Sequence, residues 1–173
     1  MTLDFHSWGY RRNAAADSYM PLAQLLRELV STIAYGGNLL INVGPALDGS
    51  IPVVMEERLL ALGAWLAVNG EGVYATAPWR AQNDTAAAAY YVKRGAAVYA
   101  HLLAWPRGGA LALAAPTPGA GATATLLAAG GGLPVQVAPA PGGGVALQLP
   151  PYAPNLCGAG SDVAWVVRLD GFL

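Results

Sequence analysis

The carboxylates are the residues of this chain that most readily suggest chemistry, because two facing carboxyl groups can act as an acid and a base. The 173 residues include ten Asp and Glu residues. Glu56 and Glu57 are adjacent on an expected helix, so their side chains diverge by about 100° and cannot flank one bond. Their expected role is that of surface charges favoured by the positive end of the helix.

The other acidic residues considered also have simpler roles than catalysis. Asp48 precedes Gly49 and is expected in a turn. Glu71 is expected to be a structural hydrogen-bonding group or a surface group, and Asp4 and Asp17 are expected to be loop and cap residues. No catalytic residue is therefore assigned in this chain.

Histidine and cysteine give no metal-site pattern. His6 and His101 are isolated in the sequence, so structural or surface roles are expected, with no metal and no cofactor. The single cysteine, Cys157, has no partner within the chain, so it is either a buried thiol or pairs with something outside the chain.

The composition argues against membrane and nucleic-acid functions. Charged residues make up 11% of the chain and the mean hydropathy is +0.41. However, Gly or Pro interrupts the charge-free span 108–161 every few residues, so no apolar run of about 20 residues could cross a bilayer. The net charge is −1, and the basic residues do not cluster beyond Arg11-Arg12, for which solvation is expected. No signal peptide opens the chain.

Two helices are expected in the first 70 residues, because apolar residues recur there at 3.6-residue spacing. The first ends at Gly36, and the second ends at Asn69-Gly70 with a left-handed stop. The expected N-terminal caps and first-turn prolines are Asp17 or Ser18 with Pro21, and Ser50 with Pro52.

Between these helices, the run 39–43 is apolar except for Asn42 and is bounded by Gly-Gly and Gly-Pro. This pattern predicts a short strand buried on both faces, as in a parallel sheet. A helix–strand–helix unit is one slice of an α/β sheet or barrel. The remaining strands are therefore expected to precede Met1 in a longer parent protein, and residues 1–70 are expected to fold poorly or aggregate in isolation.

From Gly72 the apolar spacing changes towards two, which predicts an antiparallel β-sandwich. The boundary between the two regions is placed near Pro78. The Ala- and Gly-rich segments 116–122 and 138–144 are expected to be loose loops. The expected strands are 73–76, 90–92, 97–105, 110–113, 123–127, 135–137, 145–149 and 162–169.

A series of motifs runs along the chain: Ser7-Trp8-Gly9-Tyr10-Arg11, Gly36-Gly37-Asn38-Leu39-Leu40-Ile41-Asn42-Val43-Gly44-Pro45, Asp48-Gly49, Glu57-Arg58-Leu59, Trp65-Leu66-Ala67-Val68-Asn69-Gly70-Glu71, Val73-Tyr74, Pro78-Trp79-Arg80-Ala81-Gln82-Asn83-Asp84-Thr85, Val98-Tyr99-Ala100, Trp105-Pro106 and Ala164-Trp165-Val166-Val167-Arg168-Leu169. In this order the motifs resemble the C-terminal part of the α-L-fucosidases of glycoside hydrolase family 29, of the animal lysosomal or plasma type.

The resemblance implies an α/β plus all-β fold. Residues 1–78 would be the last helix–strand–helix portion of a (β/α)8-like barrel, and residues 79–173 an antiparallel β-sandwich. The family hydrolyses terminal α-L-fucose from glycoconjugates by a retaining mechanism, which needs two carboxyl groups about 5 Å apart. Both family carboxylates precede the Ser-Trp-Gly-Tyr motif, so this chain alone is expected to be inactive.

An alternative function is a non-catalytic carbohydrate-binding or interaction module built on the β-sandwich. Against it, the segments 110–127 and 135–149 lack the exposed aromatic and charged residues that usually hold a sugar.

The resemblance places one residue at the sugar. Trp8 would lie in the loop after the seventh barrel strand, where an aromatic wall suits the C6 methyl group of fucose, with core packing as an equal alternative. Asn42 is expected to satisfy a turn or support the site rather than contact substrate. Asn83 begins the sequon Asn-Asp-Thr and would accept a glycan in the secretory pathway. His6 departs from the family, which tends to have an aromatic residue there.

The resemblance also implies a lysosomal or extracellular location. The full-length parent would have a fucosylated glycan as its partner, and a homo-oligomer remains open. No membrane or nucleic-acid partner is expected.

Overall fold

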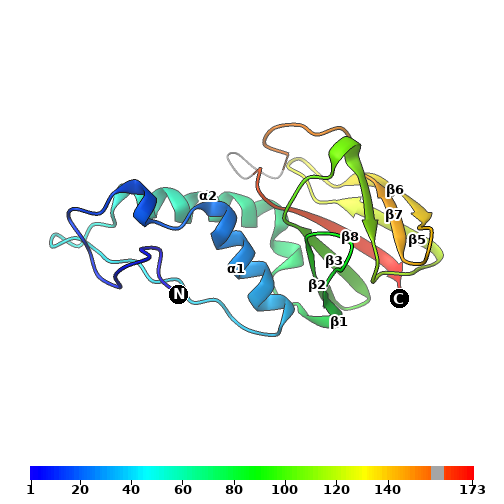
Figure 1. Cartoon of the computed structure of the whole chain (residues 1–173), viewed down its shortest axis with the longest axis horizontal. Coiled ribbons are helices and arrows are strands. Elements are labelled where there is room, and N and C mark those ends of the chain that lie inside the picture. The colour runs from blue at the N-terminus through cyan, green and yellow to red at the C-terminus, as the bar shows by residue number, and fades with distance from the viewer. Residues whose placement is uncertain (157–161) are drawn as a thin grey trace.

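The chain forms an eight-stranded antiparallel sheet with two helices at one end of it. A computed structural model describes residues 1–156 and 162–173. Cys157 lies outside the described residues. Figure 1 shows the sheet at one end of an elongated molecule and the N-terminal loops at the other, with α1 and α2 between them. The elements are η1 Ala16–Ser18, α1 Leu22–Ala34, α2 Val53–Asn69, η2 Gly70–Gly72, β1 Ala77–Asn83, β2 Ala89–Arg94, β3 Ala97–Leu102, η3 Arg107–Gly109, β4 Ala110–Leu113, β5 Pro118–Leu126, β6 Leu133–Pro139, β7 Val145–Gln148 and β8 Trp165–Phe172.

The sheet is continuous but strongly curled, so that its two halves enclose a core as in a sandwich. Its strand order is β1-β2-β3-β8-β5-β6-β7-β4, and every neighbouring pair is antiparallel. The turn between the halves lies in β6, because its first residues pair with β5 and the segment from Gln136 onward pairs with β7. The expected antiparallel all-β region is therefore confirmed.

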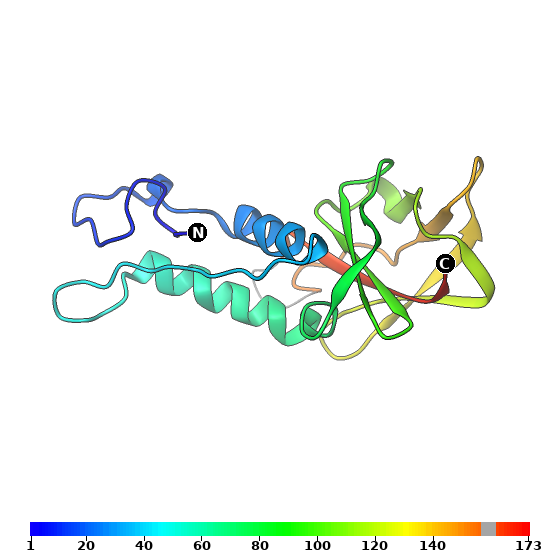
Figure 2. The same ribbon diagram turned by 90° about the horizontal axis from the view of Figure 1, so that it is seen from below.

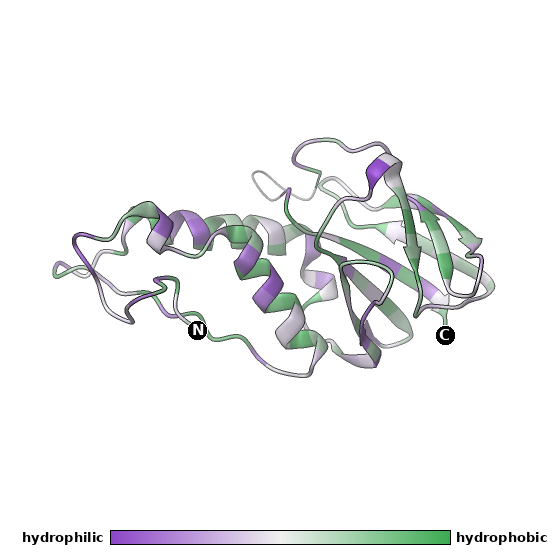
Figure 3. Cartoon of the chain, viewed as in Figure 1, coloured by the Kyte–Doolittle hydropathy of each residue, from purple (hydrophilic) through white to green (hydrophobic). Residues whose placement is uncertain are grey.

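The central strand β3 is the most enclosed part of the sheet. All six of its residues are buried, and it pairs with β2 on one side and β8 on the other. The register with β8 runs from Val98 opposite Leu169 to Leu102 opposite Trp165. In Figure 3 the strands of the sheet are coloured mainly as hydrophobic, which agrees with a core that joins the sheet to both helices.

Some strand boundaries differ from the expected ones. The strand expected at 110–113 is β4, but 73–76 is not a strand, because the chain there is still turning out of η2. The strand β1 was not expected, since Pro78, Arg80 and Gln82 hide its apolar pattern. The segment 116–122 is not simply a loop either, because all of it from Pro118 onward belongs to β5.

The helix α1 packs its apolar side against β1 and β2. Its buried residues are Leu22, Leu25, Leu26, Leu29, Val30 and Ala34. Its N-cap is Pro21, with no side-chain cap, so the expected capping by Asp17 or Ser18 is wrong: these two residues lie in η1 instead. Gly36 follows the helix with a φ of +83°, which favours glycine.

The helix α2 also begins without a side-chain cap. Its N-cap is Pro52, and Ser50 is hydrogen-bonded to Asp48 instead of capping the helix. The expected left-handed stop is wrong as well, because Gly70 has a φ of −59° and continues into η2. Glycine is needed there for space, since a Cβ on Gly70 would lie 2.8 Å from the ring of Tyr74.

The segment 39–43 is extended but is not a regular strand. Among the described residues, its one ladder contact is an isolated parallel bridge between Thr2 and Asn42. Leu40 is 78% exposed, so the expectation of a strand buried on both faces is wrong for this chain. The physical reason is that no strand of residues 1–156 or 162–173 pairs with its other edge. In Figures 1 and 2 the segment runs back from the end of α1 towards the start of α2, opposite to the direction of both helices, as the middle of a helix–strand–helix unit would.

The end of α2 is fastened to the central strands β3 and β8 by a group of contacts that we call the junction. Trp65 Nε1 donates to Ala164 O over 2.9 Å, and His101 Nε2 lies 2.9 Å from Gly72 O. A Cβ on Gly72 would come within 3.0 Å of the Val166 side chain. The junction therefore requires a glycine and two ring N–H groups at fixed places.

His101 is fully buried in the junction. Burial lowers the pKa of His101 to about 4, against the opposing effect of its hydrogen bond to Gly72. The imidazole is therefore neutral near pH 7, and its Nε2 carries the proton that Gly72 O accepts. The expected structural role of this histidine is confirmed.

Candidate functional site

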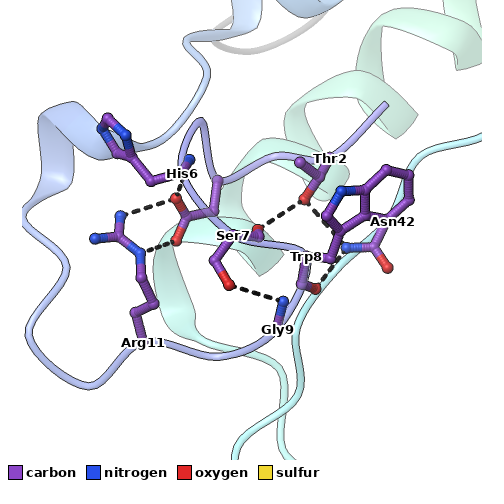
Figure 4. A network of polar contacts seen from close by, with 8 residues as sticks. Thr2, His6, Ser7, Trp8, Gly9, Arg11 and Asn42 are labelled. Carbon is purple, nitrogen blue, oxygen red and sulfur yellow. Dashed lines mark hydrogen bonds and ion pairs between the residues drawn. The ribbon is translucent and has the colours of Figure 1, made fainter.

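The loop that carries Trp8 is held by its backbone while its indole ring is exposed. Asn42 Nδ2 donates to Trp8 O over 2.8 Å and to Thr2 Oγ1 over 3.1 Å. The Trp8 side chain is 69% exposed, and Figure 4 shows its ring beside Asn42. Asn42 thus satisfies the turn, as expected, and Trp8 does not pack into the core of the described residues.

Gly44 lets this loop approach the extended segment closely. A Cβ at Gly44 would lie 2.5 Å from backbone atoms of Gly9 and Tyr10. The loop is also braced internally, because Ser7 Oγ accepts the Gly9 N–H over 3.1 Å. The position of Trp8 is therefore set by backbone contacts to the segment around Asn42.

Asp4 is buried next to this loop and is paired with Arg11. The guanidinium of Arg11 donates to both carboxylate oxygens of Asp4, over 2.7 and 2.8 Å, and the His6 N–H donates over 2.8 Å (Figure 4). The hydrogen bonds from Arg11 hold the pKa of Asp4 below its ordinary value, although burial opposes them. The expected solvation of Arg11 is wrong, whereas Arg12 is exposed.

The other acidic residues of the first half serve local structure. Glu56 and Glu57 are exposed near the start of α2, and Glu57 pairs with the adjacent Arg58 at 2.9 Å. Asp48 accepts hydrogen bonds from Ser50, which lower its pKa. The expected roles of these residues as surface and turn groups are confirmed.

Glu71 and Asp170 line a common hollow with Arg168 between them. Arg168 lies 3.1 Å from Glu71 and 2.9 Å from Asp170, and Tyr99 donates its hydroxyl to Glu71 over 2.9 Å. Because the guanidinium pairs with both carboxylates, the two acids form an ion-pair network and not an acid–base pair. The expected structural hydrogen bonding of Glu71 is confirmed.

Asp84 is a structural carboxylate that sequence reasoning missed. It is only 7% exposed, and its oxygens accept the Tyr91 hydroxyl over 2.6 Å together with four backbone N–H groups. Burial raises the pKa of Asp84, but the hydrogen bonds outweigh this effect and leave the pKa below its ordinary value. Asp84 thus ties the end of β1 to the loop after β4, whereas the preceding Asn83 is exposed. The backbone donors are Ala86, Ala87, Ala114 and Ala115.

The described part of the chain has no metal-binding cluster of three His, Cys, Asp or Glu residues. His6 is exposed, and His101 is fixed in the junction. None of the described helices is long and apolar enough to cross a bilayer.

Comparison with known families accounts for both halves of the chain. The family model "Alpha-L-fucosidase" matches residues 1–71, and the model "Alpha-L-fucosidase C-terminal domain" matches residues 82–170, more than half of the chain. The chain belongs to the α-L-fucosidase family.

Sequence relatives and solved structures agree with this assignment. An α-L-fucosidase of Branchiostoma floridae is 41% identical over the whole chain, and the human tissue α-L-fucosidase is 40% identical over 98% of it. The α-fucosidase of Thermotoga maritima, solved in complex with fucose, superposes with a TM-score of 0.78 at 27% identity over 98% of this chain. The chain covers only 38%, 36% and 38%, respectively, of these three proteins.

The replacement Asp84→Asn should lower the free energy of unfolding by about 2 kcal/mol near pH 7, because the amide would turn an NH2 group towards backbone donors. Since the fold lowers the Asp84 pKa, its contribution is complete above the ordinary carboxyl pKa of about 4 and is lost as the pH falls through the folded value. Urea unfolding at several pH values should therefore show the difference shrinking in acid.

The matched control is Asp17→Asn, the same change at an exposed residue of η1. It should alter the free energy of unfolding by no more than about 0.5 kcal/mol. Equal effects of the two replacements, or a deficit of Asp84→Asn that does not depend on pH, would contradict the role given to Asp84.

Proposed function

We propose that this chain is the C-terminal part of an α-L-fucosidase that hydrolyses terminal α-L-fucose from glycoconjugates by a retaining mechanism. In this proposal residues 1–78 are the last slice of the catalytic barrel and residues 79–173 are its β-sandwich domain. The observation that carries the proposal is the parallel bridge between Thr2 and Asn42, because a parallel pair flanked by helices is the unit of a barrel.

Exposed apolar side chains support a barrel that continues beyond this chain. Leu40, Leu47, Val53 and Leu60 are 78%, 107%, 80% and 67% exposed, respectively, and all four lie in the barrel slice. Burying such side chains is worth about 25 cal/mol per Å² of apolar surface, so neighbouring strands and helices would gain by covering them.

The acidic residues support inactivity of the chain by itself. A retaining glycosidase needs a nucleophile and an acid about 5 Å apart on either side of the glycosidic bond. Among the described residues, Asp4, Asp48 and Asp84 each have a carboxyl pKa below its ordinary value. A general acid needs the opposite shift, and Glu71 and Asp170 are both paired with Arg168.

Trp8 is proposed to form an aromatic wall of the fucose site. Its exposed ring and anchored backbone support this role, because the indole is available while its position is fixed. An aromatic face suits the apolar edge of fucose at its C6 methyl group. The substrate contacts of Trp8 would be completed by the preceding part of the barrel.

The compartment proposed is lysosomal or extracellular, since tissue and plasma α-L-fucosidases are among the relatives. Asn83 is proposed to carry a glycan there, because it is exposed at the end of β1 and begins the sequon. The parent protein would bind a fucosylated glycan and could assemble as a homo-oligomer.

A non-catalytic carbohydrate-binding module is the second candidate function. One observation favours it: Trp105, Tyr152 and Trp165 line a cleft on the sheet. These aromatic residues come from outside the two segments that, in the sequence, lacked exposed aromatic residues.

The purified 173-residue chain should release no fucose from an aryl α-L-fucoside above a control without protein. The same chain, fused behind the barrel portion of the Branchiostoma floridae relative, should hydrolyse the substrate. Hydrolysis by the chain alone would refute the proposal that its reacting carboxylates lie elsewhere.

In the active fusion protein, Trp8→Ala should raise the KM for the aryl fucoside by roughly tenfold, the equivalent of one lost aromatic contact. The control is Tyr35→Ala, which removes another exposed ring, at the end of α1. An unchanged KM after Trp8→Ala, or an equal rise in both variants, would exclude Trp8 from the sugar site.

Secretion of the chain from animal cells should yield a product whose mass falls on treatment with peptide N-glycosidase. The mass change should be absent in Thr85→Ala and present in Thr85→Ser, because only the hydroxyl residue completes the sequon. A secreted wild-type product of unchanged mass would show that Asn83 carries no glycan.

A further inference from the structure

A cleft on the sheet domain has walls from three distant parts of the chain. Its volume is about 730 Å³, within the range of about 300–1,000 Å³ usual for small-molecule sites. In Figure 1 the turn η3 and the loop after β7 lie above the sheet, and the loop reaches back over the place where α2 meets the sheet. The residues used below are Trp105, Arg107, Gln148, Tyr152 and Trp165, all of which line the cleft.

Three aromatic rings form one side of the cleft. The ring centroids of Trp105 and Trp165 are 5.3 Å apart, and those of Trp105 and Tyr152 are 5.6 Å apart, in edge-to-face arrangements. Tyr152 is 49% exposed, whereas Trp165 is only 4% exposed. The buried ring of Trp165 packs against the rings of Trp105 and Tyr152 and holds them in place. The cleft therefore presents a rigid aromatic surface to solvent.

One charged group at the cleft is not used by the rest of the described structure. Arg107 is exposed and makes no ion pair with any described residue. Its guanidinium is therefore available to donate hydrogen bonds to oxygen atoms of a ligand.

The cleft is preformed, because its two walls are hydrogen-bonded to each other. The Leu149 N–H donates to Gly109 O over 2.9 Å, and Gln148 Nε2 donates to Gly108 O over 3.0 Å. Gly109 has a φ of +76°, and a Cβ there would lie 2.8 Å from Leu149 O. Little ordering would therefore be needed on binding.

Aromatic faces beside directional donors fit a pyranose sugar better than an apolar chain. A pyranose has C–H groups that pack on an aromatic ring and hydroxyl groups that accept from a guanidinium or an indole N–H. A purely apolar occupant would make no hydrogen bond to the Arg107 guanidinium. A peptide would find few backbone groups to pair with, because the two walls of the cleft are already hydrogen-bonded to each other.

We propose that this cleft binds a pyranose unit of a glycan, on the sheet domain and apart from Trp8. The identity of the glycan as that of the fucosylated substrate rests on the proposed function, but sugar binding itself does not. The cleft would hold a sugar of a long glycan, remote from the terminal fucose.

Titration of the 173-residue chain with N-acetyllactosamine and with 2′-fucosyllactose, followed by tryptophan fluorescence, tests the proposal. At least one of the two sugars should give saturable binding. Tyr152→Ala and Arg107→Ala should each weaken it roughly five- to tenfold, since each removes one aromatic or hydrogen-bond contact. The control Tyr35→Ala, which removes an exposed ring elsewhere, should leave binding unchanged.

No saturable binding of either sugar, or binding that Tyr152→Ala and Arg107→Ala do not weaken, would overturn the proposal. The activity of the fusion protein separates this outcome from a failure of the proposed function. There, Tyr152→Ala should leave the KM for the aryl fucoside unchanged, because the aryl fucoside has no second sugar. A raised KM for the aryl fucoside would also contradict the inference.

Discussion

The contacts between the end of α2 and the two central strands hold the two halves of this chain together. Trp65 donates a hydrogen bond to Ala164 O, and His101 donates one to Gly72 O. Glu71 accepts hydrogen bonds from Tyr99 and Arg168. Most of these contacts are buried, and the histidine among them is neutral, so no unpaired charge is enclosed. With α2 fixed at its end, and α1 packed on β1 and β2, the segment between the helices has a defined course. The position of Trp8 depends on that course, because Asn42 of this segment holds the Trp8 backbone by a hydrogen bond.

The carboxylates of the chain show how its acidic chemistry is used. Asp4 is held by Arg11, Asp84 by Tyr91 and backbone N–H groups, and Glu71 by Arg168. Asp4 and Asp84 accept charged or multiple donors, which stabilises their ionised forms. All three side chains fasten loops and strands together through these contacts. These structural roles agree with the proposal that other residues form the catalytic centre.

Much of the fold could be predicted from the sequence, because the leucine spacing of α1 and the alternation in β4 are local patterns. The run 39–43 was different: its apolar residues indicate burial, but among the described residues only the stretch around Thr2 pairs with it. The strand β1 was not predicted, because Pro78 and Arg80 interrupt its pattern of apolar residues. In the sequence Asp84 is recognisable only as the middle residue of a sequon. The backbone N–H groups of Ala114 and Ala115 that donate to its carboxylate are about thirty residues away along the chain. The aromatic cleft was missed for the same reason, because Trp105, Tyr152 and Trp165 meet only in the folded sheet.

Amide hydrogen exchange of the purified 173-residue chain tests most directly whether the segment 39–43 belongs to a sheet that extends beyond it. Among the described residues, Asn42 is the only member of this segment whose amide donates a backbone hydrogen bond, to Met1 O. The amides of Leu39, Leu40, Ile41 and Val43 should therefore exchange at least about a hundredfold faster than those of β3, which is paired on both sides. Equal protection of 39–43 and β3 would mean that the segment is complete within this chain, and the barrel-slice account would be wrong.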